Sequence, residues 1–160
     1  MDLRALQQAL LNPAIYPEHP RTVEFSETHI SLLFFTKDYV YKVKKPVDFG
    51  FLDFTDLEKR KFYCHQEVEL NRRLSSDVYL GVVEISRDGG NISLGGGGEV
   101  IEYAVKMRRI PEDVLMSRLI EEGKVTDWMI ARVAEKLADF YTTADTNDEI
   151  SGYGQPERIR

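Results

Sequence analysis

The sequence predicts an α+β fold, in which one antiparallel sheet has a helix across it and is followed by the beginning of an all-helical part. Three observations predict this arrangement. Short extended segments joined by tight connections fill residues 22–45 and 78–109, a long helical segment begins near residue 55, and only helical patterns follow residue 110. Three sequential strands with such short connections indicate an antiparallel meander.

The first half of the chain supplies a short helix, three strands and the long helix. Residues 2–11 are typical of a helix that Asn12-Pro13 closes, and three prolines predict a loop over 13–20. We expect strands at residues 22–26, 30–36 and 39–45, with a turn at Lys37-Asp38 and a stop at Pro46. Thr55-Asp56-Leu57-Glu58 has the spacing of a capping box, so the helix is expected to start there and to reach Leu74.

The second half predicts two or three further strands and then helices. Residues 78–86 form a strand, Asp88-Gly89-Gly90-Asn91 a hairpin turn, residues 91–94 a short partner strand and residues 100–109 a longer one, with the glycines of 95–98 as a flexible loop. Pro111 and Gly123 bracket a helix over 111–122. Thr126 caps a last helix, and the polar residues from Thr146 onward are expected to fray.

Composition narrows the class of protein. The chain has 160 residues, 42% hydrophobic and 30% charged, which fits one domain, or one lobe with the start of the next. Its formal net charge of −6 disfavours a general nucleic-acid binder, because neutralisation of phosphates dominates such affinities. Apolar stretches are too short to cross a bilayer, no signal peptide is evident, and the single Cys64 excludes an internal disulfide. We therefore expect a cytoplasmic protein without a membrane partner.

A lysine in the third strand and a glutamate in the long helix form the most informative pair. Alternation in the strand puts Val40, Lys42 and Lys44 on one side, and Tyr39, Tyr41 and Val43 on the other. Helical spacing places Glu67 within an apolar stripe formed by Tyr63, Cys64, Val68, Leu70 and Leu74. A carboxylate in such a stripe needs a partner. Lys42 is the first candidate and Arg60, which falls in the same arc, is the second; the pair could be purely structural or could belong to a nucleotide site.

Five segments of the sequence are informative together. They are Tyr39-Val40-Tyr41-Lys42-Val43-Lys44-Lys45-Pro46, Phe49-Gly50-Phe51-Leu52-Asp53-Phe54, Glu67-Val68-Glu69-Leu70-Asn71-Arg72-Arg73-Leu74, Tyr79-Leu80-Gly81-Val82-Val83 and Tyr103-Ala104-Val105-Lys106-Met107-Arg108-Arg109-Ile110-Pro111. These segments resemble the aminoglycoside phosphotransferase-like proteins, in the branch that is typically fused to a P-loop ATPase domain, and the resemblance covers about residues 20–145.

The resemblance implies a kinase-like small lobe, with a five-stranded sheet and one helix, that leads through a hinge into a helical large lobe. Lys42 would position the phosphates of ATP, Glu67 would orient Lys42, and Val40 would pack on the adenine. The hinge would comprise Met107 to Pro111, with Met107, Arg109 and Ile110 at the adenine edge. The implied parts are an N-terminal helix and Pro-rich arm (1–20), the small lobe (21–110), the start of the helical lobe (111–145) and a polar tail (146–160).

Two departures from the family pattern limit the expected activity. The loop expected between the first two strands, Ser26-Glu27-Thr28-His29, contains no glycine to cover the phosphates. The His-Gly-Asp segment and later Asp that would supply the catalytic base and the Mg²⁺ ligands do not occur in this chain. We therefore expect the ATP-binding part of a small-molecule kinase, inactive as it stands, with its phosphate acceptor unidentified and a missing C-terminal lobe or a dimer partner covering its apolar face.

The alternative is a non-catalytic nucleotide-binding or regulatory module that keeps the kinase-like fold. His65 and Glu69 lie one helical turn apart but have no third ligand near them, so we expect a solvated pair there rather than a metal site. The sequence assigns no catalytic residue and no metal ligand within the chain.

Overall fold

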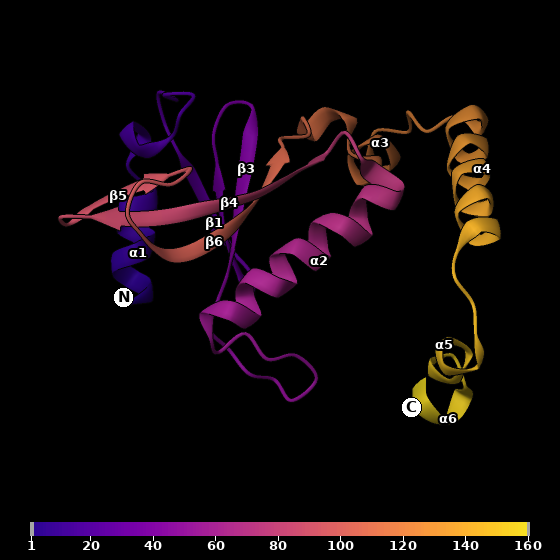
Figure 1. Cartoon of the computed structure of the whole chain (residues 1–160). Helices are drawn as coiled ribbons and strands as arrows, with labels where there is room; N and C mark the ends of the chain where they lie inside the picture. The colour runs from indigo at the N-terminus through magenta and orange to yellow at the C-terminus, as the bar shows by residue number, and fades with distance from the viewer. Residues whose placement is uncertain (1, 160) are drawn as a thin grey trace. The chain divides into compact units, whose positions relative to one another are not determined.

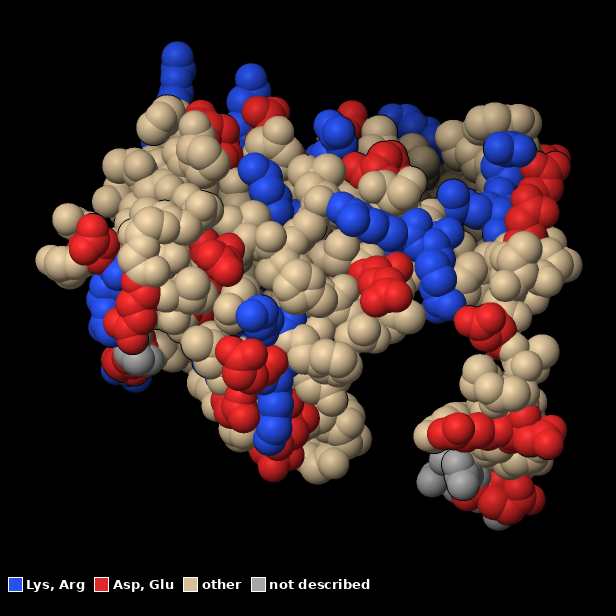
Figure 2. Space-filling view, viewed as in Figure 1, with Lys and Arg blue, Asp and Glu red and all other residues tan. Residues whose placement is uncertain are grey.

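The computed structural model of the chain describes residues 2–159; Met1 and Arg160, which fall in the predicted arm and tail, lie outside the described residues. The chain forms two compact units, residues 1–112 and 113–160, and each is considered by itself. Across the described residues, none of the helices combines the length and the apolar character needed to cross a membrane. On the face seen in Figure 2, Lys and Arg side chains are interleaved with Asp and Glu side chains.

The first unit is built on an antiparallel sheet whose strands run in the order β1-β2-β3-β6-β4-β5 (Figure 1). The strands are β1 (Glu24–Glu27), β2 (Ser31–Phe35), β3 (Tyr39–Lys44), β4 (Tyr79–Asp88), β5 (Asn91–Leu94) and β6 (Glu99–Arg108). The α+β class and the β1-β2-β3 meander are confirmed. The sheet has six strands, however, and not the five that the family resemblance implies. Strand β4 is long enough to continue into the hairpin at Asp88–Asn91, so β5 pairs with its far end.

Helices lie on both faces of this sheet. Helix α1 (Leu3–Leu10) packs on one face, where Leu6 and Leu10 join Tyr41 and Val43 in a buried cluster. Helix α2 (Leu57–Ser75) covers the other face, where Cys64 and Val68 pack against residues of β6. Between α1 and β1 the predicted loop contains a short 3₁₀ helix, Pro13–Ile15, which begins because the Asn12 side chain accepts a hydrogen bond from the Ala14 amide.

Helix α2 differs from its prediction at its start and in its buried face. Its N-cap is Asp56, whose carboxylate accepts a hydrogen bond from the amide of Lys59 at 3.1 Å, so the capping box on Thr55 is wrong by one residue. Tyr63 and Leu70, predicted within the apolar stripe, are 38% and 49% exposed. The buried face of α2 is narrower than the predicted arc: its buried residues are Arg60, Cys64 and Val68, with Leu57 and Glu67 beside them on the side that meets the sheet.

The second unit is helical, as predicted, but its helices differ from the expected ones. The single helix expected over 111–122 is replaced by a 3₁₀ turn, Glu112–Val114, and the short helix α3 (Met116–Glu121), because Leu115 between them is extended. Thr126 caps α4 (Asp127–Thr143) as predicted, with its hydroxyl accepting from the Met129 amide. The tail predicted to fray contains α5 (Asp148–Tyr153), capped by Asn147, and α6 (Pro156–Ile159).

Candidate functional site

Two lysines of β3, Lys42 and Lys44, share the carboxylate of Glu67 in α2, and these three residues together form the lysine trio. Lys42 and Lys44 are two residues apart in the strand, so both side chains leave the sheet on the α2 face. The Lys42 Nζ atom lies 2.8 Å from Glu67 Oε1, and the Lys44 Nζ atom lies 2.6 Å from Glu67 Oε2. The predicted pairing of Lys42 with Glu67 is confirmed. The contact of Lys44 with the same carboxylate was missed, although the strand alternation had placed Lys44 on the correct face.

The two lysines differ in their access to solvent. The side chain of Lys44 is 6% exposed and that of Glu67 13%, whereas the side chain of Lys42 is 26% exposed. Lys44 also lies over the ring of Phe54, with Nζ 4.9 Å from the ring centroid. Lys44 is thus an interior anchor of the carboxylate, while Lys42 is the member of the trio that can reach a ligand.

The electrostatics of the trio leave an excess of positive charge. Burial by itself raises the pKa of Glu67, but the hydrogen bonds and charges of Lys42 and Lys44 outweigh it and hold that pKa below its usual range. Glu67 is therefore ionised at neutral pH and compensates one of the two ammonium groups. The second ammonium charge has no counterpart within the trio, so an anion is the ligand that this arrangement favours.

The neighbouring thiol of Cys64 is chemically quiet. Cys64 lies three residues before Glu67 on the same helix and is fully buried, with Sγ 4.0 Å from the carbonyl oxygen of Tyr103. Burial raises the pKa of this thiol to about 12, even though the charge of Lys44 acts in the opposite direction. Since thiolates and not thiols are nucleophilic, Cys64 is part of the packing of α2 against the sheet.

An apolar surface adjoins Lys42 along the sheet. Val40 precedes Lys42 by two residues and therefore shares its face, and its partner across the β3–β6 pair is Met107. Val40 is 7% exposed, and Met107 packs against the cluster of Cys64, Val68, Tyr103 and Val105. Four of the predicted site residues, Lys42, Glu67, Val40 and Met107, thus lie on one face of the first unit.

The other two predicted site residues are Arg109 and Ile110. The contacts that the structure describes do not place either side chain on this face. The guanidinium of Arg109 is engaged with Glu24, at 2.9 and 3.1 Å, and with the carbonyl oxygen of Thr36 at 3.0 Å. Ile110 follows the end of β6 and is 44% exposed. The amide of Arg109 also donates to the carbonyl oxygen of Asp38 at 2.9 Å, so the hinge role that the resemblance implies is left to the Arg109 carbonyl group and to the main chain of Ile110.

The β1–β2 turn is fastened to the end of β3. Lys45 donates from Nζ to the carbonyl oxygen of Thr28 at 2.6 Å and pairs with Glu27 at 3.0 Å. The Thr28 hydroxyl in turn accepts from the amide of Ser31 at 3.1 Å, which closes the turn without a glycine. This turn is consequently held by side chains where a glycine-rich loop would offer free backbone amides to phosphates.

Arg60, the second candidate partner of Glu67, pairs with a different carboxylate. Its Nε lies 2.9 and 3.0 Å from the two oxygens of Glu102 in β6, and its Nη1 donates to the carbonyl oxygens of Phe54 and Thr55. Arg60 and Glu102 are both buried, and they tie the start of α2 to the sheet. The hydrogen bonds of Arg60 to its own upstream backbone explain why it is unavailable to Glu67.

A polar cavity of about 790 Å³ lies elsewhere in the first unit, between the arm that follows α1 and the β2–β3 turn. Arg109 lines it, but Lys42 and Glu67 do not. Within the described residues, no group of three or more His, Cys, Asp or Glu side chains is arranged to hold a metal ion.

Comparison with known proteins gives relatives of similar sequence but without an assigned activity. The chain is 31% identical over 141 residues to the uncharacterized protein Mb2027c of Mycobacterium bovis and to the uncharacterized proteins MT2060 and Rv2004c of Mycobacterium tuberculosis. The match covers 86% of this chain but only 27% of each relative, so the chain spans about a quarter of the length of these relatives. No family model and no solved structure matches the chain.

Proposed function

We propose that this chain is the ATP-binding small lobe, with the first helices of the large lobe, of an aminoglycoside phosphotransferase-like protein with a kinase-like fold. The observation that carries the proposal is the ion pair of Lys42 with Glu67 at 2.8 Å, in which a strand lysine is oriented by a helix carboxylate. In kinase-like sites this device aims the ammonium at the phosphates of the nucleotide. The uncompensated positive charge of the trio supports the same ligand class.

Each residue then has a distinct role toward the nucleotide. Lys42, the partly exposed lysine, would contact the phosphates, and Glu67 would hold its side chain in position. Val40 and Met107, adjacent across β3 and β6, would present an apolar surface to the adenine. The carbonyl group of Arg109 and the main chain of Ile110 would take the polar edge of the base, since the Arg109 amide already donates to Asp38.

The metal and the transfer step are not assigned to these residues. ATP would bind with Mg²⁺, which neutralises charge on the phosphates. Because the described residues contain no carboxylate cluster suited to a metal ion, the protein ligands of Mg²⁺ and the phosphate acceptor site would belong to the large lobe. In this proposal the exposed apolar side chains of α4, such as Trp128 (69%) and Ile130 (55%), contact the rest of that lobe or a second copy of the chain.

A second candidate is a non-catalytic regulatory or interaction module with the same fold. The β1–β2 turn favours it, because Lys45, Glu27 and Thr28 fasten that turn to β3 where a nucleotide-binding loop would have to adapt to phosphates. In this case the Lys42–Glu67 pair stabilises the packing of α2 on the sheet and has no ligand.

Titration of the chain with ATP and Mg²⁺, followed by calorimetry, separates the two candidates. The proposal expects saturable binding that weakens by about tenfold or more in Lys42→Ala, since a charge-assisted hydrogen bond to phosphate is lost. The melting temperature should fall little, because Lys44 still pairs with Glu67. Lys59→Ala is a matched control: Lys59 also pairs with a carboxylate, that of Asp53, but in an exposed position, and its loss should not change binding.

Absence of ATP binding by the folded wild-type chain would refute the proposal in favour of the regulatory module. So would Lys42→Ala binding ATP as tightly as the wild type while unfolding at a much lower temperature, because that result would make Lys42 a structural residue.

A further inference from the structure

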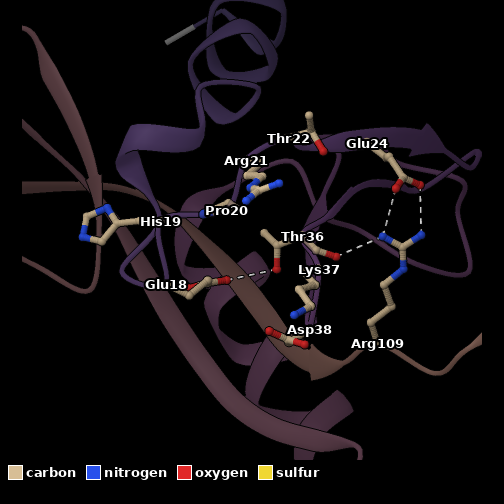
Figure 3. Close-up of a pocket in the computed structure, with 10 residues that line it drawn as sticks. All are labelled: Glu18, His19, Pro20, Arg21, Thr22, Glu24, Thr36, Lys37, Asp38 and Arg109. Atoms are coloured by element: carbon tan, nitrogen blue, oxygen red, sulfur yellow. Dashed lines mark hydrogen bonds and ion pairs between the residues drawn. The ribbon is translucent and has the colours of Figure 1, made fainter.

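The cavity on the opposite side of the first unit from the lysine trio has charge and shape of its own. It has a volume of about 790 Å³ and is lined by Glu18, His19, Pro20, Arg21, Thr22, Glu24, Thr36, Lys37, Asp38 and Arg109 (Figure 3). Pockets of 300–1,000 Å³ hold small molecules in many proteins. Tyr41, whose hydroxyl bonds to the lining residue Glu18, points away from the α2 face, so this cavity and the trio lie on different faces of β3.

Most of the negative charge in the lining is already committed. Glu18 accepts hydrogen bonds from the hydroxyls of Tyr41, at 3.0 and 3.1 Å, and of Thr36, at 3.1 Å, and lies 3.9 Å from Lys106. Glu24 forms a two-point pair with Arg109 at 2.9 and 3.1 Å. These two carboxylates therefore have little capacity left to hold a cationic ligand.

The free charges of the lining are mainly positive. Arg21 and Lys37 are exposed, and neither makes an ion pair with any residue that the structure describes. Asp38 is the one acidic residue of the lining that is likewise exposed and without an ion pair to a described residue. Figure 3 shows Arg21 and Lys37 extending on either side of Thr36, with the Glu24–Arg109 pair at one end and Asp38 near Lys37. Two available cations against one available anion favour an anionic ligand that also carries a hydrogen-bond donor.

The backbone of the arm is shaped to form one wall of this cavity. His19 has a positive φ of 46°, which is uncommon for a residue other than glycine, and its amide donates to the carbonyl oxygen of Tyr16 at 3.0 Å. The reversal at His19 directs the following residues, Arg21 and Thr22, along the cavity, while the imidazole itself points away from the other lining side chains (Figure 3).

We propose that this cavity binds a small organic anion bearing phosphate or carboxylate groups, with Arg21 and Lys37 contacting the anionic group and Asp38 accepting a hydrogen bond from a hydroxyl or amino group of the ligand. Arg109 is a third cation of the lining; its guanidinium pairs with Glu24, donates to the carbonyl oxygen of Thr36 and lies over the Phe35 ring, so it can join the site once Glu24 releases it. The cavity and the proposed ATP site use different side chains, since none of the lining side chains belongs to the Lys42 face; Arg109 adjoins both, with its side chain in the cavity and its main chain at the proposed adenine edge.

Nuclear magnetic resonance titrations of the full 160-residue chain with inorganic pyrophosphate and with citrate test this proposal and separate the two sources of negative charge. Saturable shifts of the Arg21, Thr36 and Lys37 amides are expected for at least one probe. The double variant Arg21→Ala with Lys37→Ala should weaken binding by about tenfold or more. The charge-matched control, Arg4→Ala with Lys136→Ala, removes an exposed arginine and an exposed lysine that do not line the cavity and should leave binding unchanged.

Glu24→Gln provides a test in the opposite direction. It releases Arg109 from its carboxylate, so binding of the effective probe should become tighter by about threefold to tenfold. Lys42→Ala should not change these shifts.

Three results would overturn the proposal. Equal weakening by the control pair would show unspecific attraction to positive charge, and loss of binding in Lys42→Ala would place the anion at the lysine trio. Absence of saturable shifts with both probes would show that the cavity does not bind such anions. The proposed ATP site is tested by ATP itself, so the failure of one proposal leaves the other intact.

Discussion

Removal of the Glu67 carboxylate tests the physical account of the lysine trio most directly. Glu67→Ala leaves two ammonium groups without their partner, but the two are not equivalent. Lys42 is 26% exposed and can turn toward water, whereas Lys44 is 6% exposed and is enclosed by the sheet, α2 and the Phe54 ring. The cost is therefore that of one stranded buried charge and not of two.

The magnitude follows from that single charge. Breaking a buried ion pair by removing one partner costs about 3–5 kcal/mol, and the residual exposure of the site favours the lower value, about 3 kcal/mol. For a unit of this size about 1 kcal/mol corresponds to a shift of about 4–8 °C, so the melting temperature should fall by about 12–24 °C. Glu67→Gln keeps one acceptor oxygen for one of the two lysines and should cost about 2 kcal/mol, because the charge and the second acceptor are lost.

The assay is chemical denaturation of the wild type and Glu67→Ala, together with Glu67→Gln, Lys44→Met and the double variant of these last two, which completes a double-mutant cycle. Lys44→Met leaves Glu67 paired with Lys42 and fills the interior with an apolar chain, so it should cost about 1 kcal/mol or less. The double variant should lose less stability than the sum of the single variants, with a coupling of about 1–2 kcal/mol. Additive losses, or a loss below about 1 kcal/mol for Glu67→Ala, would refute the reasoning, because Lys44 could not then depend on Glu67.

Three further predictions concern the packing of α2. Burial opposes the ionisation of Glu67, but its lysine partners hold its pKa below the usual 4.5. The ionised Glu67 therefore stabilises the fold fully above pH 4.5, and this contribution is lost as the pH falls through the lower pKa of the folded state. In acid denaturation the difference in unfolding free energy between the wild type and Glu67→Gln should shrink below about pH 4.5. Arg60→Met removes the cationic partner of buried Glu102 and the donor to two backbone carbonyls, so it should cost about 3 kcal/mol or more in chemical denaturation, whereas Lys59→Ala, at an exposed pair, should leave the stability nearly unchanged. Cys64, with its pKa raised to about 12 by burial, should react with a disulfide reagent only at the rate of global unfolding; rapid labelling of the folded chain would contradict its burial.

The strand-to-helix contact could be predicted because two local periodicities point to it independently. Alternation in β3 sets the face of Lys42, and helical spacing sets the face of Glu67, so their meeting at 2.8 Å required no knowledge of distant residues. The partner of Arg60 could not be found in this way. Glu102 is 42 residues away in sequence, and only the strand order, which places β6 between β3 and β4, brings it beneath the start of α2.

Errors in the second unit have a different origin, because signals in the sequence were given the wrong weight. Asn147 followed by Asp148 and Glu149 is a helix start, and its side chain accepts from the Ile150 amide at 2.8 Å, yet the polar composition of the tail had suggested fraying. Pro111 and Gly123 correctly mark a helical region, and Gly123 has the positive φ of 64° that suits a residue just past a helix. The extended Leu115 inside that region leaves no comparable mark in the sequence.

Lys44 also changes how a nucleotide could use the site. If Lys42 were the only partner of Glu67, a phosphate that drew Lys42 away would leave a nearly buried carboxylate without a counter-charge, and binding would be weakened by that cost. Because Lys44 remains 2.6 Å from Glu67 Oε2, the carboxylate stays paired while Lys42 turns to the ligand. Lys44→Met should therefore weaken ATP binding although Lys44 does not contact the nucleotide, and Lys44→Arg should restore it. Calorimetric titration of the two variants decides the matter: wild-type affinity in Lys44→Met would show that Lys42 binds ATP without leaving Glu67, and Lys44 would then be a packing residue only.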